Sequence, residues 1–263
     1  MLNSMQMALI KKDIRGVTAN RNMFMALLVV PLIMAVVLPS VFMLMIAFTP
    51  LDSPDFQELL VILPESMLGA DLRGSLIRLI LNNIVPVFFL MIPIMAASVM
   101  AGSSFVGEKE KRTLETLLYC PLSLRQIFNA KILASFLLSQ FVALASFAAM
   151  MLVVQTELWF ITGSLMLPGL NWPILLLIVS PSLSVISITL IVRGSAKAKT
   201  VEESQQRSVF LVMPILLLAI GQFTGIMLLG EWLLLGIGVL CAALGLILLR
   251  SSSARFHYEQ LLQ

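Results

Sequence analysis

Catalytic and redox side chains are scarce in this chain. Its 263 residues include one histidine, two cysteines and only 12% charged residues. The histidine, His257, follows the last long apolar run, so no histidine lies at membrane depth to activate a serine nucleophile. The sequence also contains no HExxH motif, no cluster of cysteine and histidine, and no GxxxxGK[ST] phosphate loop. We therefore expect no catalytic residue, no metal site and no enzyme activity, and we expect any ATP hydrolysis to belong to another subunit.

Acidic and basic residues are absent from the middle of every long apolar run. An ionisable group inside a bilayer is costly and usually marks an ion pathway or a proton relay. This absence argues against a secondary transporter driven by protons or sodium, and it favours an apolar or amphipathic cargo. Cys120 falls in a polar loop and Cys241 in the last apolar run, so we interpret both as free thiols rather than as a disulfide.

Long apolar runs dominate the chain, with 59% hydrophobic residues and a mean hydropathy of +1.02. A soluble domain has about half apolar and about 25% charged residues. We predict an all-α integral membrane protein, a single transmembrane domain over residues 1–263. Crossing a hydrocarbon core of about 30 Å takes about 20 apolar residues. Six runs have about that length or more: 23–48, 80–106, 127–154, 172–192, 209–229 and 232–249.

Prolines fall inside or beside several of these runs. A proline within a helix removes a backbone donor and displaces the preceding turn. We therefore expect kinks at Pro31, Pro39, Pro86, Pro93, Pro181 and Pro214.

Lysine and arginine are distributed unevenly between the connections. Fifteen of the 17 basic residues fall in the N-terminal segment, the even-numbered connections and the C-terminal tail. The odd-numbered connections, which lie on the opposite side of the membrane, contain only Arg73 and Arg78 as basic residues, together with seven acidic residues. Because basic residues accumulate in cytoplasmic loops, both termini are predicted to be cytoplasmic. The pI near 9.1 follows from this asymmetry, so no nucleic-acid partner is expected.

The N-terminal residues 1–21 are predicted to form an amphipathic helix that lies on the inner membrane surface. Apolar residues recur there at helical spacing, and charged residues occupy the other faces. The two sets are Met7, Ile10, Ile14 and Val17, and Lys11, Lys12, Asp13 and Arg15. The alternative is an ordinary basic flank that only orients the protein.

The segment 107–131, GEKEKRTLETLLYCPLSLRQIFNAK, is a charged island between two apolar runs. Leu114, Leu117 and Leu118 form one apolar face of a short helix within residues 107–122. Pro121 ends that helix, and Ser123 with Gln126 fits a capping box that starts the third span. We interpret the island as a cytoplasmic lever on which another protein pushes. The alternative is a merely solvated loop.

Other connections carry less information. Residues 193–207 are polar with mixed charge and are expected to form an ordinary solvated connection. The loop 49–79 is too short for a domain with its own core, so a lid or a short outer helix is expected. In the fourth run, Ser180, Ser184 and Ser187 share a helix face. Such hydroxyls either link helices or line a transport pathway, and they are our candidates for pathway lining.

The island resembles the cytoplasmic loop of ABC type-2 exporter permeases. That family shows an E-[KR]-E-x-[KR]-T-L-E-x-L-L pattern, followed by proline, a polar residue and a lysine. The matching residues are Glu108, Glu110, Arg112, Thr113, Leu114, Glu115, Leu117, Leu118, Pro121, Ser123 and Lys131. The segment 9–32 resembles the family's surface helix leading into the first span, and 199–214 resembles the loop before the fifth span.

The resemblance implies a permease subunit that dimerises, as a homodimer or a heterodimer, and docks on cytoplasmic ABC ATPase subunits that hold ATP and Mg. It implies a multi-pass protein of a bacterial or archaeal plasma membrane. The island would be the coupling helix, whose contacts with the ATPase are implied to be Glu108, Lys109, Glu110, Arg112, Thr113, Leu114, Glu115, Leu117 and Leu118. Family substrates include drugs, peptides, lipids, saccharides and ions. The alternative is a non-transporting membrane scaffold or assembly factor with the same fold.

One departure from the family concerns the last two spans. Many members carry a re-entrant outer hairpin there, but residues 209–249 hold only 41 residues. That length is used up by two spans of about 20 residues each, so a full hairpin does not fit.

Overall fold

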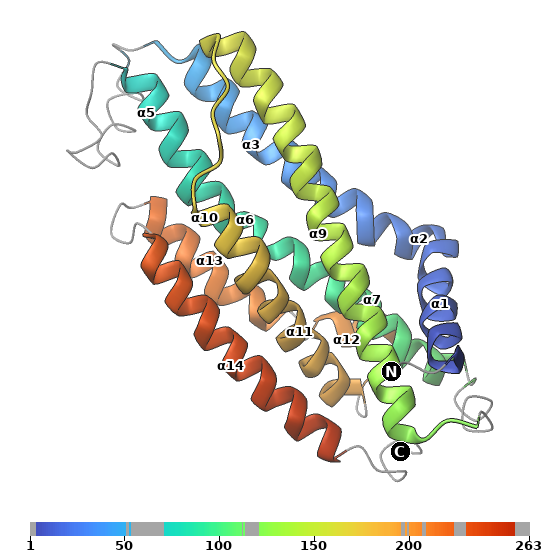
Figure 1. Ribbon diagram of the computed structural model, residues 1–263. Coiled ribbons are helices and arrows are strands. Elements are labelled where there is room, and N and C mark those ends of the chain that lie inside the picture. Colours follow the sequence, from blue (N-terminus) through green and yellow to red (C-terminus); the bar gives the residue numbers. More distant parts are fainter. Residues whose placement is uncertain are drawn as a thin grey trace.

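Every regular element in the described part of the chain is a helix (Figure 1). The computed structural model describes residues 4–50, 53, 71–111, 113, 121–195, 198, 200–206, 209–223 and 230–255. Within them, six stretches are long and apolar enough to cross a membrane. The predicted all-helical class and number of spans are therefore confirmed.

The six spans are built from the following helices. The first, Arg21–Phe48, contains α2 (Arg21–Phe24), η1 (Met25–Val29) and α3 (Val30–Phe48). The second, Leu72–Glu110, contains α5 (Leu72–Leu79), η3 (Ile80–Ile84), α6 (Val85–Phe89) and α7 (Met91–Glu110). The third is α9 (Leu124–Thr162), and the fourth contains α10 (Asn171–Ile174), η4 (Leu175–Val179) and α11 (Ser180–Ser195). The fifth contains α12 (Val201–Gln206) and α13 (Val209–Phe223), and the sixth lies in α14 (Glu231–Arg255).

The second span is the central helix of the bundle. In its most apolar window 89% of the residues are buried, whereas the corresponding share is 28% in the first span and 17% in the sixth. Large apolar side chains of the peripheral spans face outward, such as Val41, Phe210 and Leu246. Apolar surface of this extent suits a lipid environment. A displacement of the second span would therefore reach more of the bundle than a displacement of any peripheral span.

Three spans contain a π-helical turn that ends two residues before a proline. These turns are η1 before Pro31, η3 before Pro86 and η4 before Pro181. Proline has no N–H, so the carbonyls four and five residues earlier lose their helical donor, and the ladder widens into a π turn. A π turn thus precedes three of the six prolines, and the helix is interrupted at Leu90, three residues before Pro93. Pro39 and Pro214 lie inside α-helices without a π turn.

Helix α9 begins and ends at the signals that its sequence carries. Ser123 Oγ accepts a hydrogen bond from Gln126 N at 3.3 Å, and Gln126 Oε1 accepts one from Ser123 N at 2.9 Å. The predicted capping box is therefore confirmed. Gly163 ends the helix with φ of 67°, a left-handed conformation that glycine adopts readily. Its 39 residues make a helix of about 58 Å, so it extends beyond a hydrocarbon core.

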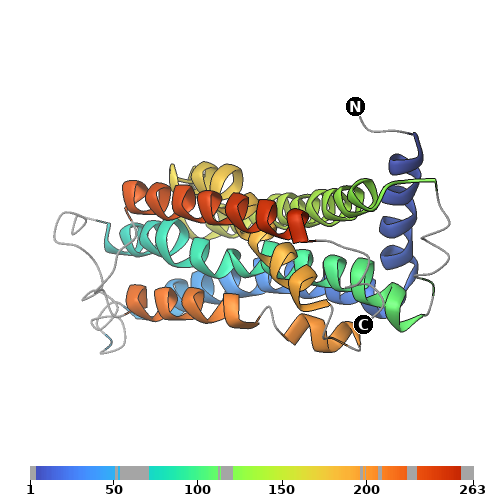
Figure 2. The same cartoon turned by 90° about the horizontal axis from the view of Figure 1, so that it is seen from below.

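One end of the bundle, which we call the basic end, carries α1 (Ser4–Ala19), the C-terminal end of α7 and the first turn of α9. Figure 2 shows α1 crossing this end at a steep angle to the spans. Its buried residues are Gln6, Leu9, Ile10, Asp13 and Val17. The helix forms, and Ile10 and Val17 of the predicted apolar stripe are buried with Ile14 partly buried, but two residues differ from the prediction. Met7 of the predicted stripe is 53% exposed, and Asp13, assigned to the solvent, is 7% exposed.

Two predictions about connections need correction. Helix α12 packs against α7 with Val201 and Ser204 buried, and Glu110 Oε2 accepts a hydrogen bond from Val201 N at 3.2 Å. An ordinary solvated connection is therefore wrong for residues 201–206. In the loop 49–79, the short outer helix is α5, but it continues into the second span instead of standing apart. Residues 51, 52 and 54–70 lie outside the described part of the chain.

Candidate functional site

The charged island lies at the basic end, at the C-terminus of the central span. Glu108, Lys109 and Glu110 form the last turn of α7, and Thr113 follows it. The other predicted contacts with an ATPase lie outside the described residues; they are Arg112, Leu114, Glu115, Leu117 and Leu118. The apolar face of the predicted coupling helix therefore stays a prediction from sequence.

The four described residues among the predicted ATPase contacts differ in exposure. Glu110 and Thr113 are exposed and Lys109 is partly exposed, so all three are accessible to a partner. Glu108 is 8% exposed and turns inward, toward α1 and α9. Glu108 thus holds the end of α7 in place, while the neighbouring residues form the accessible surface.

Glu108 belongs to a buried ion network centred on Lys131. Lys131 Nζ lies 2.9 Å from Glu108 Oε2 and 3.5 Å from Asp13 Oδ2. It also donates to the Ser104 carbonyl oxygen at 2.5 Å, and Ser104 Oγ donates to Asp13 Oδ2 at 2.5 Å. The Lys131 side chain is only 3% exposed. Four groups from α1, α7 and α9 therefore satisfy each other away from solvent.

The sequence places these groups by helical spacing. Ser104 and Glu108 are four residues apart on α7 and share one of its faces. Lys131 lies eight residues after the Ser123 N-cap, about two turns into α9. Asp13 lies on the buried face of α1. The Phe105 ring centroid lies 5.6 Å from Lys131 Nζ, so an aromatic face covers the ammonium group.

A second lysine extends the network to the surface. Lys12 Nζ donates to Glu108 Oε1 at 2.6 Å, with 58% of its side chain exposed. The two lysines and two carboxylates carry no net charge together. Removing one member of a buried pair typically destabilises a protein by about 3–5 kcal/mol, because the partner is left as an uncompensated buried charge.

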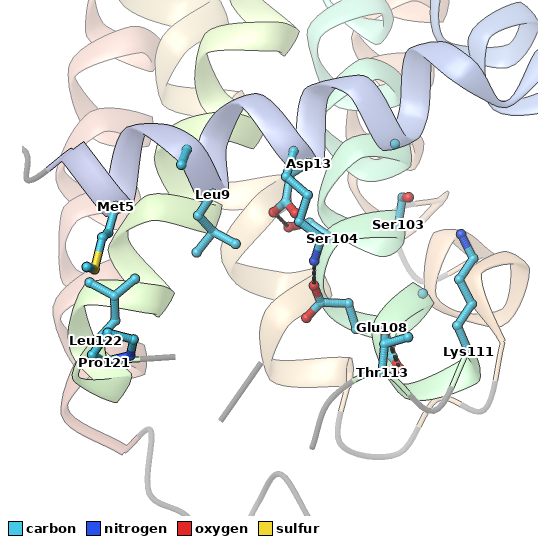
Figure 3. A pocket seen from close by; sticks show the side chains of 14 residues that line it. Met5, Leu9, Asp13, Ser103, Ser104, Glu108, Lys111, Thr113, Pro121 and Leu122 are labelled. Carbon is cyan, nitrogen blue, oxygen red and sulfur yellow. Dashed lines mark hydrogen bonds and ion pairs between the residues drawn. The ribbon is translucent and has the colours of Figure 1, made fainter. Parts of the chain in front are cut away.

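A pocket of about 780 Å³ lies beside this network (Figure 3). Its walls come from α1, from the end of α7 and from the residues before α9. Met5, Leu9, Pro121 and Leu122 form an apolar part, and Figure 3 shows Lys111 at the opposite side. Thr113 and Pro121, which flank residues 114–120, both line it. Described residues on both sides of 114–120 thus border a hollow at the end of the central span.

The comparison with protein families identifies this architecture. The family model described as ABC-2 family transporter protein matches residues 76–245. The chain belongs to the ABC-2 transporter family. The match covers the second to fifth spans, the island and much of the sixth span. It does not include α1 or the first span. No curated protein matches the chain.

Family membership indicates a permease subunit of an ABC transporter, in a multi-pass membrane protein. Membrane subunits of this family generally work with ATP-binding subunits in a membrane. Within the described residues of this permease, no group of three or more His, Cys, Asp or Glu is placed to hold a metal ion.

The three serines proposed to line a pathway are fully buried inside the ABC-2 permease. Gln140 Nε2 of α9 donates to Ser184 Oγ at 2.8 Å, and Ser180 Oγ donates to Gln140 Oε1 at 3.3 Å. Ser187 Oγ lies 2.8 Å from Ser98 Oγ of α7. In this geometry the hydroxyls join the fourth span to the third and second spans. Their lining of a transport pathway stays a prediction.

Sequence reasoning missed a polar junction between the second and fourth spans, away from the basic end; we call it the far-end junction. Pro86 leaves the carbonyls of Leu81 and Asn82 without a helical donor. Trp172 Nε1 donates to the Leu81 carbonyl oxygen at 3.1 Å, and Asn171 Nδ2 donates to that of Asn82 at 2.8 Å. The proline and the Asn171–Trp172 pair were visible in the sequence, but the separation of 91 residues between Leu81 and Trp172 hid the connection.

Proposed function

We propose that this chain is the transmembrane permease subunit of an ATP-driven ABC exporter. It would couple ATP hydrolysis by separate cytoplasmic ATPase subunits to the export of an apolar or amphipathic substrate, such as a drug, a peptide or a lipid. The observation that carries the proposal is the position of the island at the end of the most buried span in an ABC-2 family fold. A push on the island acts directly on the helix around which the others pack.

The island would form the contact with the ATPase. Lys109, Glu110 and Thr113 supply an accessible polar edge in the described structure. Arg112 and Glu115 would add charge, and Leu114, Leu117 and Leu118 would supply the apolar anchors. Charges at the rim of an interface mainly set orientation and association rate, whereas a central apolar anchor contributes more of the affinity.

The distribution of basic residues supports the orientation of this proposal. Lys and Arg favour the cytoplasmic side, so the basic end would face the cytoplasm of a bacterial or archaeal cell, together with both termini. A second permease subunit would complete the pathway, and the ATPase subunits would hold ATP and Mg. Ser180, Ser184 and Ser187 are the candidates for lining that pathway.

Affinity purification in mild detergent tests the proposal. We expect an ATPase with a P-loop to co-purify with the wild-type permease. Leu117→Asp should reduce the amount of ATPase bound, or uncouple hydrolysis from transport, more than Lys109→Ala does. Both variants should insert normally, because both residues belong to the charged island, beyond the apolar run 80–106 of the second span. Full ATPase binding and coupling in Leu117→Asp would exclude the island as the coupling element. A wild-type preparation without any ATPase would favour a membrane scaffold or assembly factor.

A further inference from the structure

The buried ion network joins α1 to α7 and α9 at the basic end of the bundle. We propose that Lys131 is a positioning residue for coupling: it locks α1 to the end of α7, so that a displacement of the island moves α1 and the first span with it. This inference rests on the proposed function, because it needs an ATPase that displaces the island.

The network binds each helix through a different group. Helix α7 contributes Glu108 and the Ser104 carbonyl, at 2.9 and 2.5 Å from Lys131 Nζ. Helix α1 contributes Asp13, whose Oδ2 lies 3.5 Å from the same nitrogen. Because one ammonium group on α9 holds both carboxylates, α1 cannot shift along α7 or α9 without separating a buried charge from its partner.

An apolar side chain at position 131 would not give the same constraint. Phe105 and Phe128 border this region, and Ala101 and Ile132 belong to the same apolar cluster. A leucine or methionine would suit such surroundings and would avoid the desolvation of a charge. Apolar contacts also allow one helix to slide along another, whereas a buried ammonium group between two carboxylates keeps both ion pairs in only one position of the helices. Register is the best-attested use of a buried polar group.

A rigid corner connects α1 to the first span. Helix α1 ends at Ala19 and α2 begins at Arg21, so Asn20 alone separates them. Its side-chain oxygen accepts hydrogen bonds from Asn22 N at 3.1 Å and Met23 N at 3.3 Å. An N-cap of this kind fixes the direction in which a helix starts. Movement of α1 is therefore transmitted to α2 and the first span.

A displacement of the island can reach the membrane spans by two routes, which depend on different contacts. The island reaches the second span directly, because its first residues, up to Glu110, belong to α7. Besides the direct packing of the first span on the second and third spans, the island reaches the first span through Glu108, Lys131, Asp13, α1 and the corner at Asn20. Loss of Lys131 would leave the first route intact and weaken the second, which would keep the Lys12–Glu108 and Ser104–Asp13 hydrogen bonds. A role in folding alone would affect both routes equally.

Distance measurements between spin labels distinguish these cases. Labels would be placed at Lys11 on α1 and Lys111 after α7, both exposed, in a chain whose two native cysteines are replaced. The permease would be reconstituted with its ATPase and compared with and without ATP and Mg. In the wild type, the distribution of Lys11–Lys111 distances should be narrow, and it should not change when ATP and Mg are added. In Lys131→Met, the ATPase should still bind. The distribution of Lys11–Lys111 distances should become broader and should change when ATP and Mg are added. Coupling between hydrolysis and movement of the first span should fall about fivefold or more.

Lys131→Arg keeps the positive charge between the two carboxylates and is the charge-conserving control, which should restore a narrow distribution of distances. If Lys131→Met does not fold, the triple variant Asp13→Asn, Glu108→Gln and Lys131→Met removes the buried charges together, which proteins tolerate better than a single removal. A folded variant of either kind with an unchanged distance and full coupling would overturn the inference. A wild-type chain that binds no ATPase would instead overturn the proposed function, so the two failures are distinguishable.

Discussion

At the scale of single residues, prolines decide where polar side chains are needed. Pro86 removes the donor for two carbonyls of the second span, and the side chains of Asn171 and Trp172 replace it. Trp172 is fully buried and packs edge-on against Phe89, with ring centroids 5.4 Å apart. The far-end junction therefore fixes the fourth span to the point where the second span is distorted.

Asn171→Ala should destabilise the permease by about 0.5–1.5 kcal/mol, because the partly buried Asn82 carbonyl loses its hydrogen bond. Pro86→Ala supplies a backbone N–H for that carbonyl. In this background the cost of Asn171→Ala should shrink, with an interaction energy of about 0.5 kcal/mol or more. Thermal unfolding of the four variants in detergent measures the cycle. Additive effects would show that Asn171 does not compensate for the proline.

Residue identities were predictable where the signal is local. The capping box of Ser123 and Gln126 spans four residues and was predicted correctly. Asp13 was placed wrongly, because helical spacing groups charged residues on solvent faces and its partner Lys131 lies 118 residues away. Nothing in the sequence near Asp13 reports that partner. Lys131 itself was noticed only as part of a family pattern.

At the scale of elements, close helix packing depends on small residues at particular positions. On α14, a Cβ at Gly238 would lie 3.0 Å from Ile178 Cγ2 and 3.1 Å from Val179 Cγ2, whereas a Cβ at Gly236 meets nothing within 4 Å. Gly238 therefore lets the sixth span approach η4 of the fourth span. Gly236 lies on the exposed face of the same helix.

Gly238→Val should destabilise the permease by about 1–3 kcal/mol through overpacking. Gly236→Val is the matched control, since both changes have the same effect on helix propensity. The midpoints of thermal unfolding in detergent should fall for Gly238→Val only. Equal midpoints would mean that the sixth span does not pack on η4 in this way.

The serine face of the fourth span makes a second prediction about an element. Ser187 is fully buried, and its Oγ lies 2.8 Å from Ser98 Oγ. Ser187→Leu should therefore lower the unfolding temperature through overpacking, and Ser187→Ala should cost about 0.6 kcal/mol. An unchanged unfolding temperature in Ser187→Leu, combined with loss of transport, would instead support pathway lining.

At the scale of the whole molecule, composition predicts the number of spans but not their order of burial. Each span had to be apolar to cross a bilayer, so hydropathy found all six. The same apolarity hides which span is central, because lipid and protein interior favour similar side chains. The central position of the second span therefore became visible only in the structure.

The proposed orientation of the molecule rests on the distribution of basic residues and can be measured directly. In a background without Cys120 and Cys241, Lys111→Cys should react with an impermeant thiol reagent only from the inside. Ser164→Cys, exposed at the opposite end of α9, should react only from the outside. The reverse pattern would place the basic end outside the cell, where a cytoplasmic ATPase could not bind it.

The central claim is that a separate ATPase acts on the island at the end of the second span. Photo-crosslinking from Thr113, which is exposed beside α7, tests it in native membranes, with Ser164 as the control position. The account predicts that Thr113 captures a protein with a P-loop, that ATP and Mg change the yield, and that Ser164 captures none. Thr113 crosslinks to lipid or to the permease alone, in a chain that unfolds as cooperatively as the unsubstituted one, would contradict it.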